Sequence, residues 1–319
     1  MMTTVFDDLF SDEYAVIDVR SPAEYAAGHV PGAINIAIFN DEERARVGTA
    51  YVQNGREPAI DIGLKIVGPK LADFVAEARA LGKPLIVYCW RGGMRSSSMG
   101  WLFTTAGLNV RVVPRGYKGF RAWGLAIISR PWKLHVVGGR TGSGKTHHLH
   151  QLMVRGEQIL DLEGLANHKG SSFGALGELP QPTTEHFMNL MCRDLHRLSA
   201  EHTLWVEDES QNIGTVVIPD VFYNAMQQAP IDVLDVPREQ RVINLVEDYG
   251  SATPEGLIAA FERIRRKLGG ERCNQAIGAV SAGDLATAAE IALEYYDRTY
   301  DYCLKQRTEN SEQRTENSE

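Results

Sequence analysis

A short basic loop surrounds one of the four cysteines, in the segment Cys89-Trp-Arg-Gly-Gly-Met-Arg95-Ser96. The apolar run 84–88 before it predicts a strand that ends at the cysteine, and a helical pattern follows the loop. Loop N–H groups, the start of the next helix and the charges of Arg91 and Arg95 all favour an anion. We therefore predict a reactive thiol at Cys89 that carries sulfur or a related chalcogen, with Arg95 and Arg91 as its catalytic partners. The alternative is a small buried cysteine with a structural role.

A second motif, Gly139-Arg-Thr-Gly-Ser-Gly-Lys145-Thr146, matches the Gly-x4-Gly-Lys-Thr pattern of phosphate-binding loops. It lies where that pattern requires, after an apolar run at 134–137 and before a helix. Its glycines let successive amides point at phosphate oxygens, the helix start adds its dipole, and Lys145 adds a full charge. The motif predicts a di- or triphosphate with magnesium at Thr146, and it leaves open whether that ligand is ATP or a non-nucleotide diphosphate. The predicted diphosphate-binding residues are Gly139, Thr141, Gly142, Ser143, Gly144, Lys145 and Thr146.

Carboxylates follow the apolar run 203–206, as in the acidic strand that accompanies many phosphate loops. One of them could order the magnesium ion, and another could act as a general base. We predict Asp208 as the metal contact, with Glu207 and Asp161 as the other acidic candidates. The alternative for each is an ordinary acidic residue at the end of a strand.

The bulk composition is that of a soluble globular protein, with 44% apolar and 23% charged residues. No apolar run approaches the roughly 18 residues of a membrane span, and the N-terminus has no signal-peptide pattern. The cysteines form no metal-binding spacing, which predicts reduced thiols in a cytoplasmic protein. The net charge of −8 argues against indiscriminate binding to nucleic acid, although a local basic patch remains compatible with it.

Strand and helix patterns alternate along two stretches of the chain, which predicts an α/β protein with two mostly parallel sheets. We expect a first domain over 1–130 and a phosphate-loop domain with a helical C-terminal part over 131–305. The exactly repeated polar segment over 306–319 is predicted to be disordered. Residues 39–69 are less regular, and they are either a flap over the active site or a long surface connection. The predicted strands are 14–19, 33–36, 84–88, 134–137, 158–162, 203–206 and 231–236, and the clearest helices are 71–81, 95–106, 257–268 and 286–302.

The segment Val16-Ile-Asp18-Val-Arg20-Ser-Pro-Ala-Glu24-Tyr-Ala-Ala-Gly-His-Val-Pro-Gly-Ala-Ile-Asn35 closely resembles the N-terminal signature of rhodanese domains. The Cys89-x5-Arg95 spacing is also typical of their active site, and the resemblance spans roughly residues 5–125. It implies a persulfide-type carrier at Cys89, held by loop amides and Arg95. It also implies that Asp18, Arg20 and Glu24 hold the fold together through hydrogen bonds.

The combination of both domains resembles the tRNA 2-selenouridine synthase family, up to about residue 303. Members of that family are transferases that geranylate the 2-thiouridine at the wobble position of tRNA with geranyl diphosphate. They then replace the S-geranyl group with selenium from selenophosphate. The resemblance implies a prenyl diphosphate at the phosphate loop and a selenium anion or a perselenide at Cys89. It rests on the two motifs and on Asn40–Thr49, Asp161–Gly174, Glu207-Asp-Glu-Ser210 and Arg265-Arg-Lys-Leu-Gly269.

This resemblance also implies that some residues contact the prenyl chain and that others contact tRNA. Candidate walls of a prenyl channel are Gly63, Tyr51 and Phe173, for which plain core packing is the alternative. Candidate contacts to tRNA phosphates are Arg263, Arg265, Arg266, Lys267, Arg272, His168 and Lys169, of which the helical cluster could equally be a solvated face.

Other functions remain open from the residues alone. An ATP-dependent sulfurtransferase or kinase fused to a rhodanese domain would use the same two motifs, and so would a nucleotide-sensing regulatory module. A selenophosphate-supplying enzyme is a possible protein partner, and no membrane partner is expected.

Overall fold

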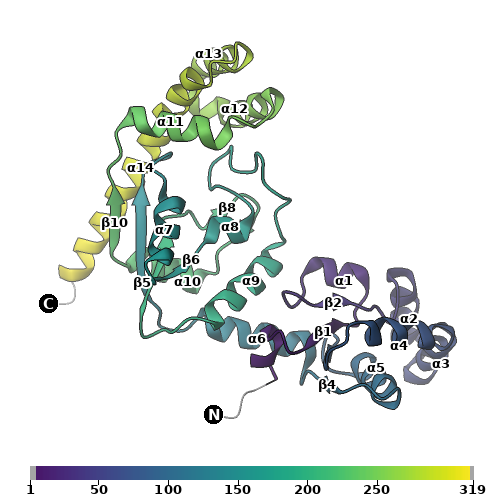
Figure 1. Ribbon diagram of the computed structural model, residues 1–319. Helices are drawn as coiled ribbons and strands as arrows, with labels where there is room; N and C mark the ends of the chain where they lie inside the picture. The colour runs from purple at the N-terminus through teal and green to yellow at the C-terminus, as the bar shows by residue number, and fades with distance from the viewer. Residues whose placement is uncertain (1–4, 317–319) are drawn as a thin grey trace. The chain divides into compact units, whose positions relative to one another are not determined.

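The computed structural model describes residues 5–316, with side chains described to residue 307, and the chain forms two compact units. The first unit contains the described residues up to Ile127 together with Met188–Arg193. The second contains Ile128–Phe187 and the described residues from Asp194 onward (Figure 1). The sequence predicts a boundary after residue 130, and it does not predict that part of a later helix packs with the first unit.

The first unit is built on a parallel four-stranded sheet with the strand order β2-β1-β3-β4. The two central strands are buried along their whole length, as expected of a parallel sheet covered on both faces. β4 was not predicted, because it has only three residues and the charged Arg111 interrupts its apolar pattern. The strands are β1 Ala15–Asp18, β2 Ile34–Asn35, β3 Leu85–Tyr88 and β4 Val110–Val112.

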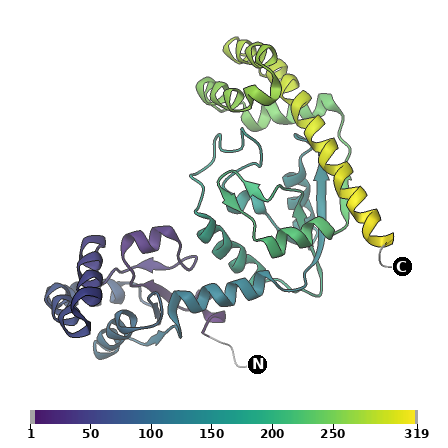
Figure 2. The ribbon, with the colours of Figure 1, turned by 180° about the vertical axis from the view of Figure 1, so that it is seen from behind.

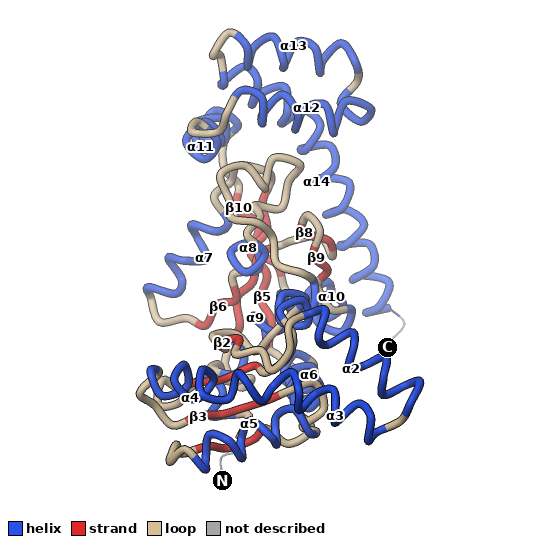
Figure 3. Tube along the Cα trace, turned by 90° about the vertical axis from the view of Figure 1, so that its right-hand side faces the viewer, coloured by secondary structure: helices blue, strands red, loops and turns tan. Residues whose placement is uncertain are grey.

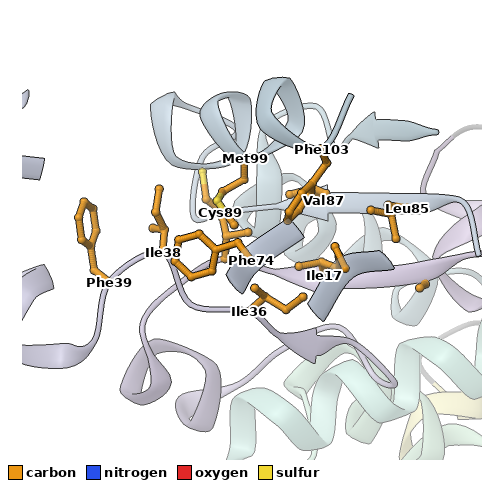
Figure 4. Packing of buried hydrophobic residues seen from close by; sticks show 13 residues of the cluster. Ile17, Ile36, Ile38, Phe39, Phe74, Leu85, Val87, Cys89, Met99 and Phe103 are labelled. Atoms are coloured by element: carbon orange, nitrogen blue, oxygen red, sulfur yellow. The ribbon is translucent and has the colours of Figure 1, made fainter. Parts of the chain in front are cut away.

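Helices cover this sheet and close its core. Ile17 and Val87 from the sheet pack with Phe74, Met99 and Phe103 from two of the helices (Figure 4). The helices are α1 Pro22–Ala27, α2 Asp41–Asn54, α3 Arg56–Val67, α4 Leu71–Ala80, α5 Met94–Thr105 and α6 Gly116–Ile128, with 3-10 turns at Asp7–Phe10 and Gly68–Lys70.

The segment 39–69 is helical, so the prediction of a less regular stretch is wrong there. Asn40 begins α2 with a reciprocal cap, in which its side chain accepts from the Glu43 N–H and Glu43 accepts from the Asn40 N–H. Gly55 separates α2 from α3, and Pro58 lies in the first turn of α3, where no intrahelical donor is needed.

The second unit has its own parallel sheet, in the order β10-β5-β7-β6. β5 lies between two neighbours, so the phosphate loop follows a central strand of the sheet. Together the two parallel sheets confirm the predicted α/β class. The strands are β5 Lys133–Gly139, β6 Gln158–Leu160, β7 Thr203–Glu207 and β10 Ile231–Leu234, and β8 Asn212–Ile213 pairs antiparallel with β9 Val216–Val217.

Three helices of the second unit, α11, α12 and α13, lie together beyond one end of its strands, as Figures 1 and 3 show. The long helix α14 packs against all three and continues past the sheet (Figure 2). Apolar side chains of α12, α13 and α14 form a separate cluster with Phe173. The helices are α7 Lys145–Val154, α8 Leu162–Ala166, α9 Thr184–His196, α10 Asp220–Gln228, α11 Arg238–Tyr249, α12 Pro254–Leu268, α13 Gly270–Ser281 and α14 Leu285–Glu316.

The prediction of disorder over 306–319 is wrong for residues 306–316, because α14 continues to Glu316. Extending a formed helix costs little, and Glu, Gln and Arg of the polar repeat are good helix formers. Residues 317–319 lie outside the described part of the chain. Within residues 5–316, none of the helices combines the length and the apolar character that a membrane span requires.

Candidate functional site

Cys89 follows the end of β3, at the carboxyl edge of the first sheet and beside Met99 (Figure 4). Its side chain is only 3% exposed. The thiol sulfur lies 3.1 Å from Ser96 Oγ and 3.9 Å from the Gly93 carbonyl oxygen. Burial works to raise the pKa of this thiol. Hydrogen bonds from the Ser96 hydroxyl and from backbone N–H groups, with the charge of Arg95, outweigh burial and lower the pKa below its ordinary value.

The backbone of the cysteine loop is held by the start of α6. The Tyr117 N–H donates to the Cys89 carbonyl at 2.8 Å, and the Lys118 N–H donates to the Trp90 carbonyl at 2.9 Å. Gly116 makes this approach possible, because its φ is +55° and a side chain there would collide with the Cys89 carbonyl oxygen. The loop is therefore rigid on the side that faces α6.

The arginines and carboxylates around the loop divide into two pairs. Arg95 donates to Glu24 at 2.5 Å, which positions its guanidinium close to the loop. Arg20 and Asp18 form a fully buried pair at 2.6 Å, and Arg20 also donates to the Gly28 carbonyl at 2.6 Å, as expected of residues with a structural role. Arg91 has an exposed side chain, and its backbone N–H contributes to lowering the pKa of the thiol.

The phosphate loop of the second unit has the geometry that its sequence predicts. Gly144 takes a left-handed conformation with φ +74°, and Lys145 begins α7 directly after it. Lys145 Nζ donates to the Gly139 carbonyl at 3.2 Å. Among the described residues, the buried Ser143 hydroxyl has no hydrogen-bond partner. An unsatisfied buried hydroxyl beside a lysine and a helix N-terminus fits an anion such as diphosphate.

Side chains of α11 donate hydrogen bonds to carbonyl groups of the phosphate loop. Asn244 donates to the Gly142 carbonyl at 2.8 Å, and Arg241 donates to the Thr141 carbonyl at 3.2 Å. These two hydrogen bonds fix the backbone of the loop at Thr141 and Gly142.

α14 adds a second set of contacts around the same loop. Tyr300 is the nearest of them, since its hydroxyl accepts from the Gly139 N–H at 2.7 Å. Asp297 pairs with Arg241 at 2.7 Å, and Asp301 pairs with Arg140 at 2.9 Å.

The acidic candidates have different partners from one another. Asp161 caps α8 by accepting from the Gly164 N–H at 2.6 Å, which is a structural role. Asp208, predicted as the metal contact, pairs with Arg307 at 3.0 Å. Thr146 instead donates to Glu163 at 3.0 Å, and sequence reasoning did not select Glu163 for the site.

Glu163 belongs to a buried cluster of carboxyl groups. A side chain at Gly170 would meet oxygens of both Glu163 and Glu209, so these two carboxyls flank one small space. Glu207 accepts from the Leu162 N–H at 3.1 Å. Burial, reinforced by the neighbouring acids, raises the pKa of Glu207 to about 8, and it also raises the pKa of Glu209. Glu207 therefore retains its proton near neutral pH.

These oxygens are suitable donors for magnesium, which prefers oxygen ligands and usually takes only one or two protein carboxylates beside substrate phosphates. Within the described residues, no group of three or more histidine, cysteine or carboxylate side chains could hold a metal ion on its own. Thr146 and Glu163 fit the smaller set that a phosphate-bound magnesium ion needs.

A cavity of about 610 Å³ opens in front of the phosphate loop. Its volume is in the range of small-molecule sites. Its lining includes the loop, Glu163 and Glu209 of the carboxyl cluster, and four tyrosines: Tyr223, Tyr249, Tyr296 and Tyr300.

A smaller cavity of about 60 Å³ adjoins the first one and is almost entirely apolar. Phe173, Phe261, Leu257 and Val280 lie in its wall. Both cavities share residues in their linings, namely Thr141, Ser171, Leu245, Tyr249 and Tyr296. The phosphate site thus borders directly on an apolar pocket.

The three prenyl-channel candidates do not lie together in one unit. Phe173 belongs to the second unit and lines the apolar pocket. Tyr51 and Gly63 belong to the first unit, where Tyr51 is 60% exposed on α2 and Gly63 lies against Phe39.

The basic candidates for tRNA binding are largely engaged within the protein. Arg265 pairs with Glu262 at 2.6 Å, and Arg272 pairs with Glu294. Of the helical cluster, Arg266 and Lys267 have exposed side chains, and Arg263 donates to the Ser172 carbonyl at 2.6 Å.

His168 and Lys169 belong to the wall of the large cavity. Burial, followed by the charge of Arg263, lowers the pKa of His168, which therefore favours its neutral form. Lys169 pairs with Glu178 at 3.2 Å.

Comparisons with known proteins find matches for both parts of the chain. Residues 3–122 match the family model of the rhodanese-like domain, and residues 132–319 match that of the tRNA 2-selenouridine synthase AAA domain. The tRNA 2-selenouridine synthase of Nitrosomonas europaea is 38% identical to this chain, with 82% of this chain and 69% of the relative covered. That of Shewanella denitrificans is 34% identical, with 95% and 91% covered. That of Bordetella petrii is 36% identical, with 94% and 89% covered.

One family accounts for the cysteine loop, for the phosphate loop beside an apolar pocket, and for the relatives that match over most of the chain. The chain belongs to the tRNA 2-selenouridine synthase family.

Proposed function

We propose that this protein converts the 2-thiouridine at the wobble position of tRNA into 2-selenouridine in two steps. The first step transfers a geranyl group from geranyl diphosphate to the sulfur. The second replaces the S-geranyl group with selenium from selenophosphate. The observation that supports this most is the apolar pocket beside the phosphate loop, which suits a diphosphate that carries a hydrocarbon chain.

In the first step the phosphate loop would hold the diphosphate through its N–H groups, Lys145 and Ser143. The sulfur of 2-thiouridine attacks the first carbon of the geranyl chain, so a carbon–sulfur bond forms and a carbon–oxygen bond breaks. The charge of Lys145 stabilises the departing diphosphate. Magnesium held by Thr146 and Glu163 would supply further neutralising charge there. An ionised member of the carboxyl cluster could accept the proton that the thiouridine loses.

The hydrocarbon chain would lie in the apolar pocket next to Phe173. At about 60 Å³ this pocket is far smaller than an ordinary ligand site, so binding requires the helices α12 to α14 to move apart or the large cavity to take part of the chain. Apolar contact with a chain of this size would contribute roughly 0.8 kcal/mol for each buried methylene group.

In the second step the cysteine loop would receive selenium. Selenium is equally reduced in selenophosphate and in the selenouridine product, so delivery as an anion needs no oxidant. A carbon–selenium bond forms, the carbon–sulfur bond breaks with loss of the geranyl thiol, and water takes the phosphoryl group. A perselenide on Cys89 would require an oxidant, so we favour a Cys89 that positions the anion, with Arg95 and the loop N–H groups stabilising its charge.

The test is to incubate the protein with 2-thiouridine tRNA, geranyl diphosphate and selenophosphate, and to analyse the nucleosides by mass spectrometry. We expect S-geranyl-2-thiouridine without selenophosphate and 2-selenouridine with it. Folded protein that yields neither product would refute the proposal. Lys145→Ala should abolish geranylation, whereas Cys89→Ala should geranylate normally and lose selenation. Product formation that depends on ATP instead of geranyl diphosphate would support the sulfurtransferase alternative.

The proposed reaction also implies a macromolecular substrate, a supplying enzyme and a cellular compartment. tRNA is the macromolecular substrate, and an enzyme that makes selenophosphate must act before this one. Both fit a cytoplasmic reaction with reduced cysteines.

A further inference from the structure

Trp90 occupies an unusual position in the first unit. It follows Cys89 directly, yet its side chain is 38% exposed. The backbone beneath it is fixed, because the Lys118 N–H donates to its carbonyl at 2.9 Å. An exposed indole on a rigid backbone is a surface on which a flat ligand can stack.

The indole is also supported from within the protein. Its ring lies 5.7 Å from that of Tyr117, tilted by 44°. The guanidinium carbon of Arg20 lies 5.8 Å from the centre of the Trp90 ring, and Arg20 itself is held by its ion pair with Asp18 at 2.6 Å. These contacts restrict the orientation of Trp90, so binding to it would cost little side-chain entropy.

Basic residues occur in the two loops next to Trp90, in contrast with the net charge of −8 of the whole chain. These loops, residues 89–96 and 113–118, contain no acidic residue, although the Glu24 carboxylate pairs with Arg95. They present the exposed side chains of Arg91, Arg115 and Lys118, and Arg56 at the start of α3 approaches the same loop through Met94 at 4.0 Å. Such charges would attract the phosphates on either side of a stacked base.

We propose that Trp90 is the stacking platform for the unpaired base that is modified, and that the basic side chains around it bind the adjoining RNA phosphates. This inference rests on the proposed function, since it assigns the tRNA base to this loop. Unpaired RNA bases are commonly bound by stacking on aromatic side chains. Because Trp90 adjoins Cys89, a base stacked on it would present its sulfur to the selenium site. Trp90 is therefore a positioning residue.

The test uses the full chain and an RNA hairpin with one unpaired 2-thiouridine in its loop. Trp90→Ala should weaken hairpin binding about 5- to 150-fold, the range that stacking of one base contributes. Trp90→Phe should retain most of the affinity, and Trp90→Leu, which keeps an apolar side chain but has no π face, should lose it. Trp101→Ala is the matched control, because Trp101 is 67% exposed on α5 and lies outside these loops.

Two further measurements separate stacking from a structural effect. The rate at which Cys89 is alkylated should be the same in Trp90→Leu as in the parent protein, and a fully paired RNA of equal length should bind both equally. Equal hairpin affinity of the parent and Trp90→Leu would overturn the inference. So would an equal loss of affinity for the paired RNA, which would assign the surface to phosphates alone.

Failure of the inference is distinguishable from failure of the proposed function. With S-geranylated hairpin as substrate, Trp90→Leu should raise KM for selenation and change kcat less. A Trp90→Leu variant that forms 2-selenouridine with unchanged KM refutes the platform and leaves the activity standing. A parent protein that binds the hairpin through Trp90 but forms neither product refutes the activity alone.

Discussion

The raised pKa of Glu207 predicts a measurable dependence of stability on pH. The rise from 4.5 to about 8 corresponds, at 1.36 kcal/mol for each pKa unit, to a cost of about 5 kcal/mol for the ionised group. Because the folded protein binds this proton more tightly than the unfolded chain does, the contribution to stability is fully present below about pH 4.5. It is lost as the pH rises to about 8.

Glu207→Gln removes the ionisation while an amide oxygen still accepts from the Leu162 N–H. The variant should match the parent protein near pH 4.5 and become more stable by up to about 5 kcal/mol above pH 8. For a unit of this size that difference raises Tm on the order of 10 °C. Thermal unfolding followed by circular dichroism from pH 4.5 to 9 measures it.

Glu201→Gln is the control, since Glu201 is an exposed carboxyl in the same unit and should show no such trend. A difference between Glu207→Gln and the parent that stays constant over this pH range would refute the reasoning. A variant that is less stable than the parent at pH 9 would refute it as well.

Three other substitutions test separate parts of the structure. Ser96→Ala should raise the pKa of the Cys89 thiol, so the pH midpoint of its alkylation should move upward; an unchanged midpoint contradicts the assigned hydrogen bond. Gly116→Ala should lower stability by about 2 kcal/mol or more in urea unfolding, and by more than Gly107→Ala, which is also left-handed but meets no atom within 4 Å. Phe173→Ala should cost about 3–5 kcal/mol of stability and raise KM for geranyl diphosphate without changing the affinity for inorganic diphosphate. Phe74→Ala, in the core of the first unit, should lower stability without that change in KM.

The parts of the fold that sequence predicted well are those that local patterns determine. The buried strands β1 and β3 are continuous apolar runs, and the cysteine and phosphate loops follow strands directly. Helices α2 and α3 were missed because glycines and Pro58 read as breaks. The Asn40–Glu43 capping box was the signal that could have identified the start of α2.

The site was predictable only as far as its motifs extend. Glu163 was missed because its contact with Thr146 joins segments that share no local pattern. The contact of Tyr300 with Gly139 spans an even longer stretch of chain. Similarly, sequence alone did not show that Arg265 of α12 pairs with Glu262 and that Arg272 of α13 pairs with Glu294 in the fold.

The position of α14 has a consequence for how the protein is made. Asp297, Tyr300 and Asp301 complete the contacts around the phosphate loop, although they are synthesised long after it. Domains of a nascent chain fold as units in order of synthesis, so the cysteine loop has all of its described partners well before the phosphate loop does. A chain stalled on the ribosome before residue 297 would therefore present a reactive thiol without a completed diphosphate site.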